Sequence, residues 1–399
     1  MKITAIETIR LPGSPNLLWV EVHTDEGVVG LGETFYGAGA VEAHIHETAA
    51  PMILGKDPLR INDLARYTVG YVGFVGSSAE MRGASAIDIA LWDLWGKSTG
   101  QPLHQLLGGR VRDSIPVYNT CAGTRYVQDG ATQDTRFYGL DKKDPKGYED
   151  LDAFLNRADE LALSLLEMGI TGLKIWPFDF AAERWQGSHI TKEELKKALE
   201  PFAKIRKAVG DRMDIMVELH AMWHLTPVRR IAEALEEFNP FWIEDPVRMD
   251  HLSSLGAFAM GTNVPVATGE TLGGIAQYRS LIEMQAVGYA IMDLTWCGGL
   301  TVARKVAGMA EAWHLPVTFH DCTGPVALAA SVHAALAVSN SFVQEVVRAF
   351  YYGWYGDLVT QLPPLNNGII EAPPGPGLGL SLQPDVKTRP GARVRRTEL

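Results

Sequence analysis

Hydrophobic and polar residues alternate at the start of the chain, and this period of two predicts three short strands. The expected strands are residues 2–10, 18–24 and 28–34. Asp25-Glu26-Gly27 is typical of a turn between the last two. Apolar residues then recur at helical spacing over residues 80–97, and Gly100 follows the end of that helix. Roughly the first hundred residues therefore predict an α+β unit built on an antiparallel meander.

From residue 115 the pattern changes to short apolar runs that alternate with amphipathic helices. This alternation predicts parallel strands with right-handed crossovers, and eight such strands favour a closed barrel over an open, doubly wound sheet. An eighth helix is not evident, because the chain after the last strand is rich in Pro and Gly. The predicted strands are 115–119, 173–176, 215–218, 241–244, 265–268, 290–293, 317–320 and 342–345, and the predicted helices are 153–168, 192–209, 227–238, 252–260, 275–284, 300–313 and 325–338.

The expected fold class is therefore α/β, a modified TIM barrel of the (β/α)7β kind with an N-terminal α+β capping domain. The capping domain is expected over residues 1–114, completed by a tail over roughly residues 355–399, with the barrel over residues 115–354. A polar segment at 129–148 predicts a long loop after the first barrel strand, which is typical of a lid, with a disordered segment as the alternative.

Composition narrows the possible partners. The net charge is −11, and the sole basic cluster is Arg393, Arg395 and Arg396, which argues against nucleic acid or an anionic membrane. The three cysteines are far apart and odd in number, so a disulfide framework or a thiolate metal site is not expected. The chain has neither the apolar stretch of a signal peptide near its start nor an apolar run of transmembrane length, so a cytoplasmic location is expected.

In a parallel barrel the residues that perform chemistry lie at the carboxyl ends of the strands. Polar side chains occupy these positions from the second predicted strand to the eighth. From the third strand onward they recur at intervals of 23 to 27 residues, about one strand-loop-helix unit, so they are expected at one height around the same mouth. They are Lys174, Glu218, Glu244, Glu270, Asp293, His320 and Glu345.

Glu218, Glu244 and Glu270 are predicted to bind Mg²⁺. Three carboxylates in a partly dry pocket are costly unless a cation neutralises them, and oxygen ligands select a hard ion. Mn²⁺ is an alternative, whereas zinc normally prefers His or Cys ligands. A single Glu is more often salt-bridged or solvated, but three at equal register favour a metal site.

Several motifs, in the same order along nearly the whole chain, resemble those of a known protein family. SAIDIALWDLWGKSTGQPLHQLLGG in the first domain, then WIEDP, TGE, the Asp293 and His320 pair and the PGPGLG tail resemble the enolase superfamily, mandelate racemase subgroup. The resemblance implies a capping domain over a barrel that lacks its last helix, with Mg²⁺ holding a small-molecule substrate's carboxylate while an enediolate forms. It also implies a homo-oligomer, from dimer to octamer.

His320 is the candidate general base, since Asp293 on the neighbouring strand can orient the imidazole and stabilise its charged form. An isolated histidine is more often structural, but the resemblance and the Asp neighbour favour catalysis. Removing a proton next to a carboxylate places negative charge on oxygen, and Lys174 is well placed to stabilise it. Glu345 resembles the family residue that hydrogen-bonds the substrate carboxylate, with a buried or paired Glu as the alternative.

The second predicted strand departs from the family's racemases. They carry Lys-x-Lys, where the second Lys is a base on the opposite face, whereas this chain reads Lys174-Ile175-Trp176. Racemisation is therefore disfavoured unless Lys174 takes that role, while elimination needs one base and one acid. His220, two residues after Glu218, is the candidate acid, with His224 as an equal alternative.

The predicted substrate-binding residues are aromatic. Trp176 ranks highest because it replaces a family lysine, and Tyr36 and Trp296 are further candidates, although aromatic residues more often serve packing. The expected reaction is dehydration of an acid sugar to a 2-keto-3-deoxy acid, a hydro-lyase activity. A cycloisomerase that opens an anhydro or lactone ring, an epimerase or racemase, and a catalytically silent Mg²⁺-binding relative are the alternatives.

Overall fold

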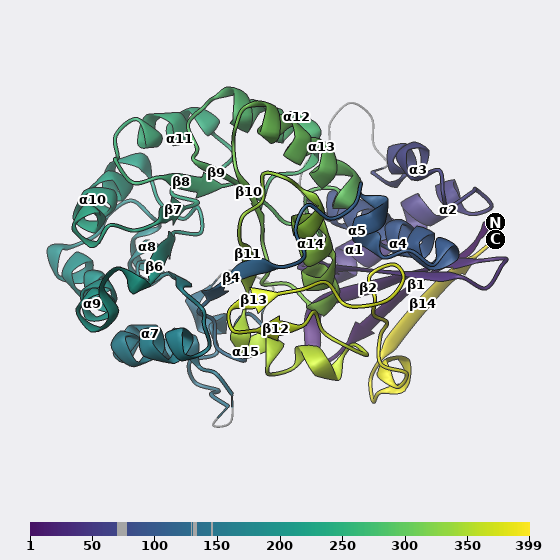
Figure 1. Cartoon of the computed structure of the whole chain (residues 1–399), viewed down its shortest axis with the longest axis horizontal. Coiled ribbons are helices and arrows are strands. Elements are labelled where there is room, and N and C mark those ends of the chain that lie inside the picture. The colour runs from purple at the N-terminus through teal and green to yellow at the C-terminus, as the bar shows by residue number, and fades with distance from the viewer. Residues whose placement is uncertain (70–77, 129, 131–133, 145–146) are drawn as a thin grey trace.

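The computed structural model describes residues 1–69, 78–128, 130, 134–144 and 147–399. An antiparallel sheet of order β14-β1-β2-β3 forms one end of the molecule, and a curled parallel sheet with its helices forms the other (Figure 1). The first sheet consists of β1 (Ile3–Leu11), β2 (Ser14–Thr24), β3 (Val29–Phe35) and β14 (Arg393–Glu398). The two ends of the chain thus meet in one sheet, since Ala5 of β1 pairs with Glu398 of β14.

The capping domain is held together by close contact between one helix and its sheet. Helix α4 (Ala79–Thr99) packs directly on β3, and an added Cβ at Gly32 would lie 1.9 Å from the Ala86 carbonyl oxygen. Gly30 approaches the Ala90 carbonyl equally closely, at 2.0 Å. Only glycine allows this approach of backbone to backbone. The remaining helices of this domain are α1 (Ala38–His44), η1 (Ile45–Ala49), α2 (Ala50–Ile53), α3 (Ile61–Thr68) and α5 (Leu103–Leu106).

The other part of the molecule is a TIM-like curl of parallel strands. Neighbouring strands pair in sequence order from β4 to β10, and β11 pairs with β4. Side chains and backbone link β10 to the chain before β11, because Val317 N donates to the Asn340 carbonyl (3.0 Å) and Thr318 Oγ1 to the Val343 carbonyl (2.8 Å). The strands are β4 (Ile115–Thr120), β5 (Gly172–Ile175), β6 (Asp214–Glu218), β7 (Trp242–Glu244), β8 (Val266–Thr268), β9 (Tyr289–Met292), β10 (Val317–Phe319) and β11 (Gln344–Val346). The predicted fold class is confirmed.

Helices follow the strands around the outside of the curl (Figure 1). Seven were predicted at these places, and one of them differs. The predicted helix 153–168 is two helices, α6 and α7, because the backbone leaves the helical conformation at Arg157, with φ of −145° and ψ of 54°. The Asn156 carbonyl accepts a hydrogen bond from Lys204 Nζ at 2.8 Å. The helices are α6 (Asp150–Asn156), α7 (Ala158–Glu167), α8 (Asp179–Trp185), α9 (Lys192–Val209), α10 (Leu225–Leu235), α11 (Leu252–Ala259), α12 (Gly274–Glu283), α13 (Gly299–Ala312), α14 (Pro325–Ala337) and α15 (Arg348–Tyr351).

Two regions predicted as loops, the C-terminal tail and residues 129–148, contain some regular structure. The tail forms a small hairpin, β12 (Leu365–Asn366) and β13 (Ile369–Ile370), that pairs with β4. In the predicted loop 129–148, residues 129, 131–133 and 145–146 lie outside the described residues, while the described part contains the turn η2 (Thr135–Phe137) and the buried Tyr138. Short 3-10 turns complete the structure: η3 (Gly210–Arg212), η4 (Glu236–Phe238), η5 (Tyr355–Asp357) and η6 (Val386–Thr388).

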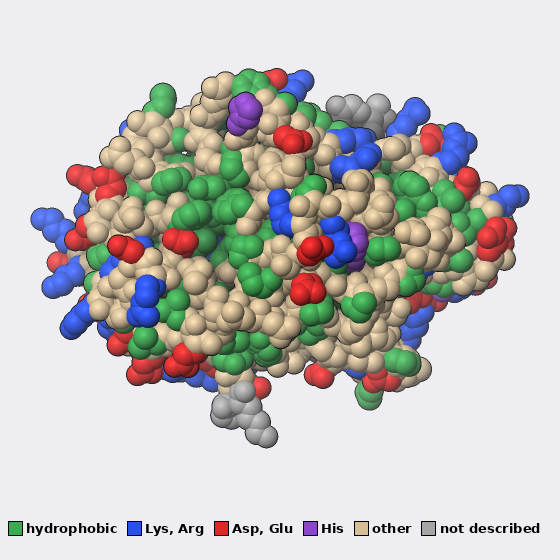
Figure 2. Space-filling model, in the orientation of Figure 1, with side chains coloured by type: hydrophobic (Ala, Val, Ile, Leu, Met, Phe, Trp, Pro, Cys, Tyr) green, Lys and Arg blue, Asp and Glu red, His purple; other side chains and the backbone are tan. Residues whose placement is uncertain are grey.

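The outer surface carries charges of both signs. On the face shown in Figure 2, acidic and basic side chains are interspersed around the rim of the molecule. None of the helices in the described ranges is long and apolar enough to span a lipid bilayer.

Candidate active site

Three glutamates meet at the carboxyl end of the parallel strands. Glu218 ends β6, Glu244 ends β7 and Glu270 follows β8, and their carboxylate oxygens lie within 4.8 Å of one another. The pairing of Glu218 with Glu244 in the β6/β7 ladder sets this common height. All three side chains are buried. The sequence-predicted triad is therefore brought together in space.

Lys174 of β5 lies among these carboxylates. Its Nζ is 2.5 Å from Glu244 Oε1, 3.0 Å from Glu345 Oε1 and 3.4 Å from Glu218 Oε2. Burial alone would lower the pKa of Lys174, but the surrounding carboxylates raise it well above its ordinary value. The residue is therefore a permanent buried cation, one positive charge against four carboxylates counting Glu270.

The triad suits a hard divalent cation. Burial raises the pKa of Glu218, Glu244 and Glu270, since each charge is removed from water and placed near its neighbours. Among the described residues, Glu270 Oε2 has no hydrogen-bond partner, although it is buried. An all-oxygen set with an unsatisfied oxygen matches the ligands that Mg²⁺ and Mn²⁺ prefer.

His320 follows β10 and forms a pair with Asp293, which follows β9. Its Nδ1 is 2.7 Å from Asp293 Oδ2, and its Nε2 is 3.5 Å from Glu270 Oε2. Burial lowers the pKa of His320, but Glu270 and Glu345 raise it well above its ordinary value. A cation bound at the triad would offset the charge of Glu270 and favour the neutral form of this histidine.

His220 forms a second histidine–carboxylate pair. Its Nδ1 is 2.7 Å from Asp179 Oδ2 at the start of α8, and the Tyr138 hydroxyl donates to the same oxygen at 2.5 Å. Burial alone would lower the pKa of His220, but Asp179 and Glu218 raise it to about 9. The Asp179 carboxylate therefore favours the protonated form of the ring. Since β6 is the third and β10 the seventh of eight strands, the two pairs come from opposite sides of the curl.

The structure separates the two histidines that the sequence left equal. His220 lines the central pocket, whereas His224 is exposed just before α10. The backbone of His220 has φ of 49°, a left-handed conformation that is rare for a residue with a side chain. Tyr36 and Val127, which line the same pocket, have φ of 67° and 47°. Such conformations concentrate at functional sites, where the surroundings enforce them.

Two known families match successive parts of this chain. Residues 5–108 match the mandelate racemase / muconate lactonizing enzyme N-terminal domain, and residues 157–386 match the enolase C-terminal domain-like family. The chain belongs to the mandelate racemase/muconate lactonizing enzyme family of the enolase superfamily. The resemblance seen in the sequence motifs is confirmed. Members of this family typically bind a divalent metal ion, and the buried glutamate triad could hold it.

The relatives of this family member include sugar-acid dehydratases. D-Xylonate dehydratase of Haloferax volcanii is 31% identical, covering 96% of this chain and 88% of the relative. D-Galactonate dehydratase of Ralstonia nicotianae is also 31% identical, covering 96% and 92%. Among solved structures, a mandelate racemase subgroup enolase from Agrobacterium tumefaciens, which contains a succinimide residue, is 52% identical, with a TM-score of 0.88 and 100% and 99% of the two chains covered. An enolase from Sargasso Sea environmental sequencing is 43% identical, with a TM-score of 0.88 and the same coverage.

In this family member the three predicted aromatic residues line one pocket. Trp176, Tyr36 and Trp296 border it together with Lys174 and His320. The ring of Trp296 lies 5.2 Å from the ring of His320, and the ring of Trp176 lies 5.7 Å from that of His220. Each histidine thus has an indole beside it. Tyr36 comes from the end of β3, so the capping domain supplies part of the wall.

Glu345 at β11 is completely buried and has several polar partners. Its Oε1 accepts a hydrogen bond from the Thr120 hydroxyl and contacts Lys174, and its Oε2 accepts from the Asp321 backbone N–H at 3.1 Å. Burial raises the pKa of Glu345, but Lys174 and His320 lower it below its ordinary value. A direct bond to a substrate carboxylate stays a prediction for this residue.

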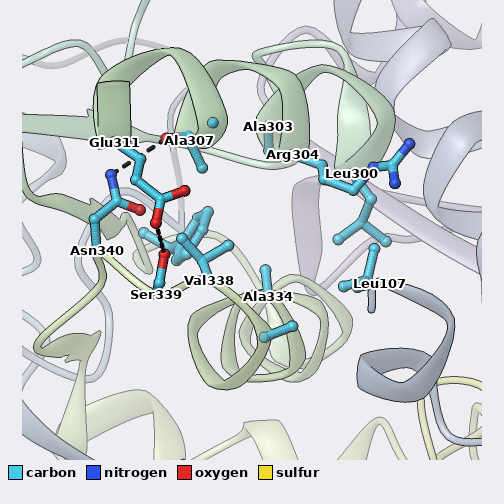
Figure 3. A pocket seen from close by; sticks show the side chains of 13 residues that line it. Leu107, Leu300, Ala303, Arg304, Ala307, Glu311, Ala334, Val338, Ser339 and Asn340 are labelled. Atoms are coloured by element: carbon cyan, nitrogen blue, oxygen red, sulfur yellow. Dashed lines mark hydrogen bonds between the residues drawn. The ribbon is translucent and has the colours of Figure 1, made fainter. Parts of the chain in front are cut away.

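A second pocket lies outside the curl, between α13 and α14 (Figure 3). Small side chains such as Ala303, Ala307 and Ala334 line it, and its carboxylate, Glu311, is hydrogen-bonded to Ser339. Its lining contains no histidine, unlike that of the central pocket.

Sequence reasoning missed the partners of His220. Asp179 begins α8, the helix after β5, one strand away from the histidine, and a search for carboxylates beyond each strand end would have found it. Tyr138 lies in a loop without a periodic pattern, so its contact with Asp179 had no sequence signal.

Proposed function

We propose that this protein is a Mg²⁺-dependent acid-sugar dehydratase. The observation that carries the proposal is the pair of histidine–carboxylate dyads, His320–Asp293 and His220–Asp179, which enter one pocket from opposite sides beside the glutamate triad. The relatives named D-xylonate and D-galactonate dehydratase support a hydroxylated sugar acid as the substrate.

The reaction needs a base, an acid and a site for the substrate carboxylate. Lys174 lines the pocket, and its charge attracts the carboxylate and stabilises the negative charge that develops on it. A bound Mg²⁺ would add Lewis acidity toward the same carboxylate. With Nδ1 held by Asp293, His320 uses Nε2 to take the α-proton.

Elimination completes the reaction on the other side. The electron pair of the broken C–H bond forms the carbon–carbon double bond as the bond from the β-carbon to its hydroxyl breaks. Asp179 favours the protonated form of His220, and Nε2 of this ring donates the proton with which the hydroxyl leaves as water. The resulting enol tautomerises to a 2-keto-3-deoxy acid, so one water is lost.

An epimerase is the second candidate, and the position of His220 favours it. The missing Lys-x-Lys base had argued against racemisation, but His220 occupies the side opposite His320 and could return a proton to the other face of the α-carbon. The two candidates differ in what His220 protonates: a leaving hydroxyl or a carbon.

His220→Asn separates these reactions. We expect wild-type protein with Mg²⁺ to form 2-keto acid from a member of an aldonic and aldaric acid panel. The variant should lose 2-keto acid formation by about 10²- to 10³-fold, since one acid is removed, and should still exchange the α-proton in D₂O through His320. The measurements are a 2-keto acid assay and NMR of the recovered substrate.

The exposed His224→Asn is the matched control and should match wild type within about two-fold, as surface substitutions usually do. Epimer without 2-keto acid in the wild-type reaction would replace the dehydratase proposal by the epimerase. Mg²⁺ binding without turnover or α-proton exchange of any panel member would contradict both.

A further inference from the structure

The carboxylate of Asp293 is fixed by a neighbour that neither the metal site nor the base accounts for. Thr295 donates to Asp293 Oδ1 twice, from its backbone N–H (2.6 Å) and from its hydroxyl (2.6 Å). The other oxygen, Oδ2, faces His320 Nδ1 at 2.7 Å. All three residues are buried, so solvent does not compete for these bonds. Oδ1 of Asp293 is therefore bound by Thr295, and Oδ2 is left to bind His320.

Thr295 is in turn held by the capping domain. The hydroxyl of Thr34, near the end of β3, donates to the Thr295 carbonyl oxygen at 3.0 Å. The next residue, Trp296, donates its indole N–H to the carbonyl oxygen of Phe35 at 3.1 Å. Two consecutive residues of β3 are therefore hydrogen-bonded to two consecutive residues after β9. Thr34 and Thr295 are 261 positions apart, so this contact depends on the assembled fold.

A second charged group, the guanidinium of Arg82, also acts on Asp293. The Arg82 guanidinium of α4 stacks over the Trp296 ring, 5.3 Å from its centroid. Burial lowers the pKa of Arg82, and the nearby Asp293 carboxylate counteracts this, so the two charges act on each other. Without the Thr295 bonds, Asp293 could rotate toward Arg82 and leave the His320 ring unoriented. A shift of about 1 Å in a reacting group can cost on the order of 100-fold in rate.

We propose that Thr295 is a positioning residue for the base, and that β3 of the capping domain, through Thr34, fixes Thr295 in place. The base is then oriented from the cap: Thr34 holds Thr295, Thr295 orients Asp293, and Asp293 orients His320. The expected effect on kcat rests on the proposed function, whereas the orientation of the His320 ring does not depend on which reaction is catalysed.

Thr295→Val tests the hydroxyl, because valine keeps the branched shape. We expect kcat for the acid sugar to fall about 10- to 100-fold with KM within about three-fold, because the base and not the carboxylate site is disturbed. Thr295→Ser restores the donor and should recover kcat to within about three-fold. Thr34→Val should lower kcat in the same direction by at least about three-fold.

Thr318→Val is the matched control. Thr318 is also buried and donates its hydroxyl to a backbone carbonyl, that of Val343, but it does not contact Asp293. Its loss of a buried bond should change kcat by less than about three-fold. Equal losses of kcat in the Thr295→Val and Thr318→Val proteins, or no rescue by serine, would overturn the positioning role. Wild-type kcat in Thr34→Val would overturn the part played by the cap.

A second readout does not depend on the substrate. In full-length protein labelled with ¹⁵N-histidine, the Nδ1–H signal of His320 is assigned by its absence in His320→Asn. The strong bond to Asp293 should place this proton far downfield, and Thr295→Val should move it upfield or broaden it beyond detection. An unchanged signal in Thr295→Val refutes the proposal even if the enzyme acts on another acid. Absent turnover by wild type with the expected NMR change would instead contradict only the proposed function.

Discussion

His320→Asn is expected to lower kcat for the acid sugar by about 10³-fold, because it removes the group that takes the α-proton. Asparagine is shorter and cannot accept a proton at the position of Nε2. Solvent-derived deuterium should also fail to enter the α-position of recovered substrate. Steady-state kinetics and NMR of the substrate in D₂O measure the two losses.

The fold should survive this change, since Asp293 keeps both bonds from Thr295. Circular dichroism and thermal unfolding verify it. His314→Asn is the control: His314 is exposed and has φ of 53°, which asparagine tolerates well, so kcat should stay within about two-fold. Full α-proton exchange in His320→Asn would move the base to another residue.

Glu270→Gln is expected to abolish Mg²⁺ binding and, with it, turnover. The substitution keeps the size of the side chain but removes a buried charge from the triad and the oxygen that lacks a hydrogen-bond partner. Mg²⁺ at about 100 times its Kd should stabilise the wild-type protein by roughly 2.7 kcal/mol, because an ion that binds only the folded state shifts unfolding by mass action. Thermal unfolding with and without Mg²⁺ measures this, and kcat should fall at least about 10³-fold.

Glu345→Gln is the matched control for binding. Glu345 is also buried and contacts Lys174, but it is not one of the three glutamates that could hold the ion. Its Mg²⁺-dependent rise in melting temperature should match that of wild type, whatever happens to catalysis. A normal rise in Glu270→Gln would show that Mg²⁺ binds elsewhere.

Much of the fold was predictable because local signals agreed with the tertiary structure. Helix α9 matches its predicted bounds since Thr191 and Glu194 form a capping box that fixes the start, and Gly210 follows the end. The glutamate triad was predictable for another reason. Residues separated by one strand-loop-helix repeat lie at the same level on neighbouring parallel strands. Glu218 and Glu244 are direct partners in the β6/β7 ladder as a result.

The other features of the site depend on the three-dimensional arrangement of the chain, which the local sequence pattern does not predict. His220 and His224 both follow β6, and the left-handed turn at His220 and Ala221 directs one into the pocket and leaves the other exposed. The Thr34–Thr295 bond joins two domains whose relative placement had no sequence signal. At the break between α6 and α7, the Asn156 carbonyl accepts a hydrogen bond from Lys204 of α9, again a tertiary contact.

The pairing of β14 with β1 has a consequence for how the protein assembles. Until residues 393–398 are available, β1 is an open strand edge, and its partner is separated from it by the whole barrel. The barrel sequence is therefore synthesised before the cap sheet can be completed. A nascent or truncated chain that lacks β14 exposes the unpaired backbone groups of β1, which can pair with another chain. Lys387, which bridges Glu7 of β1 and Glu21 of β2, is delivered by the same late segment.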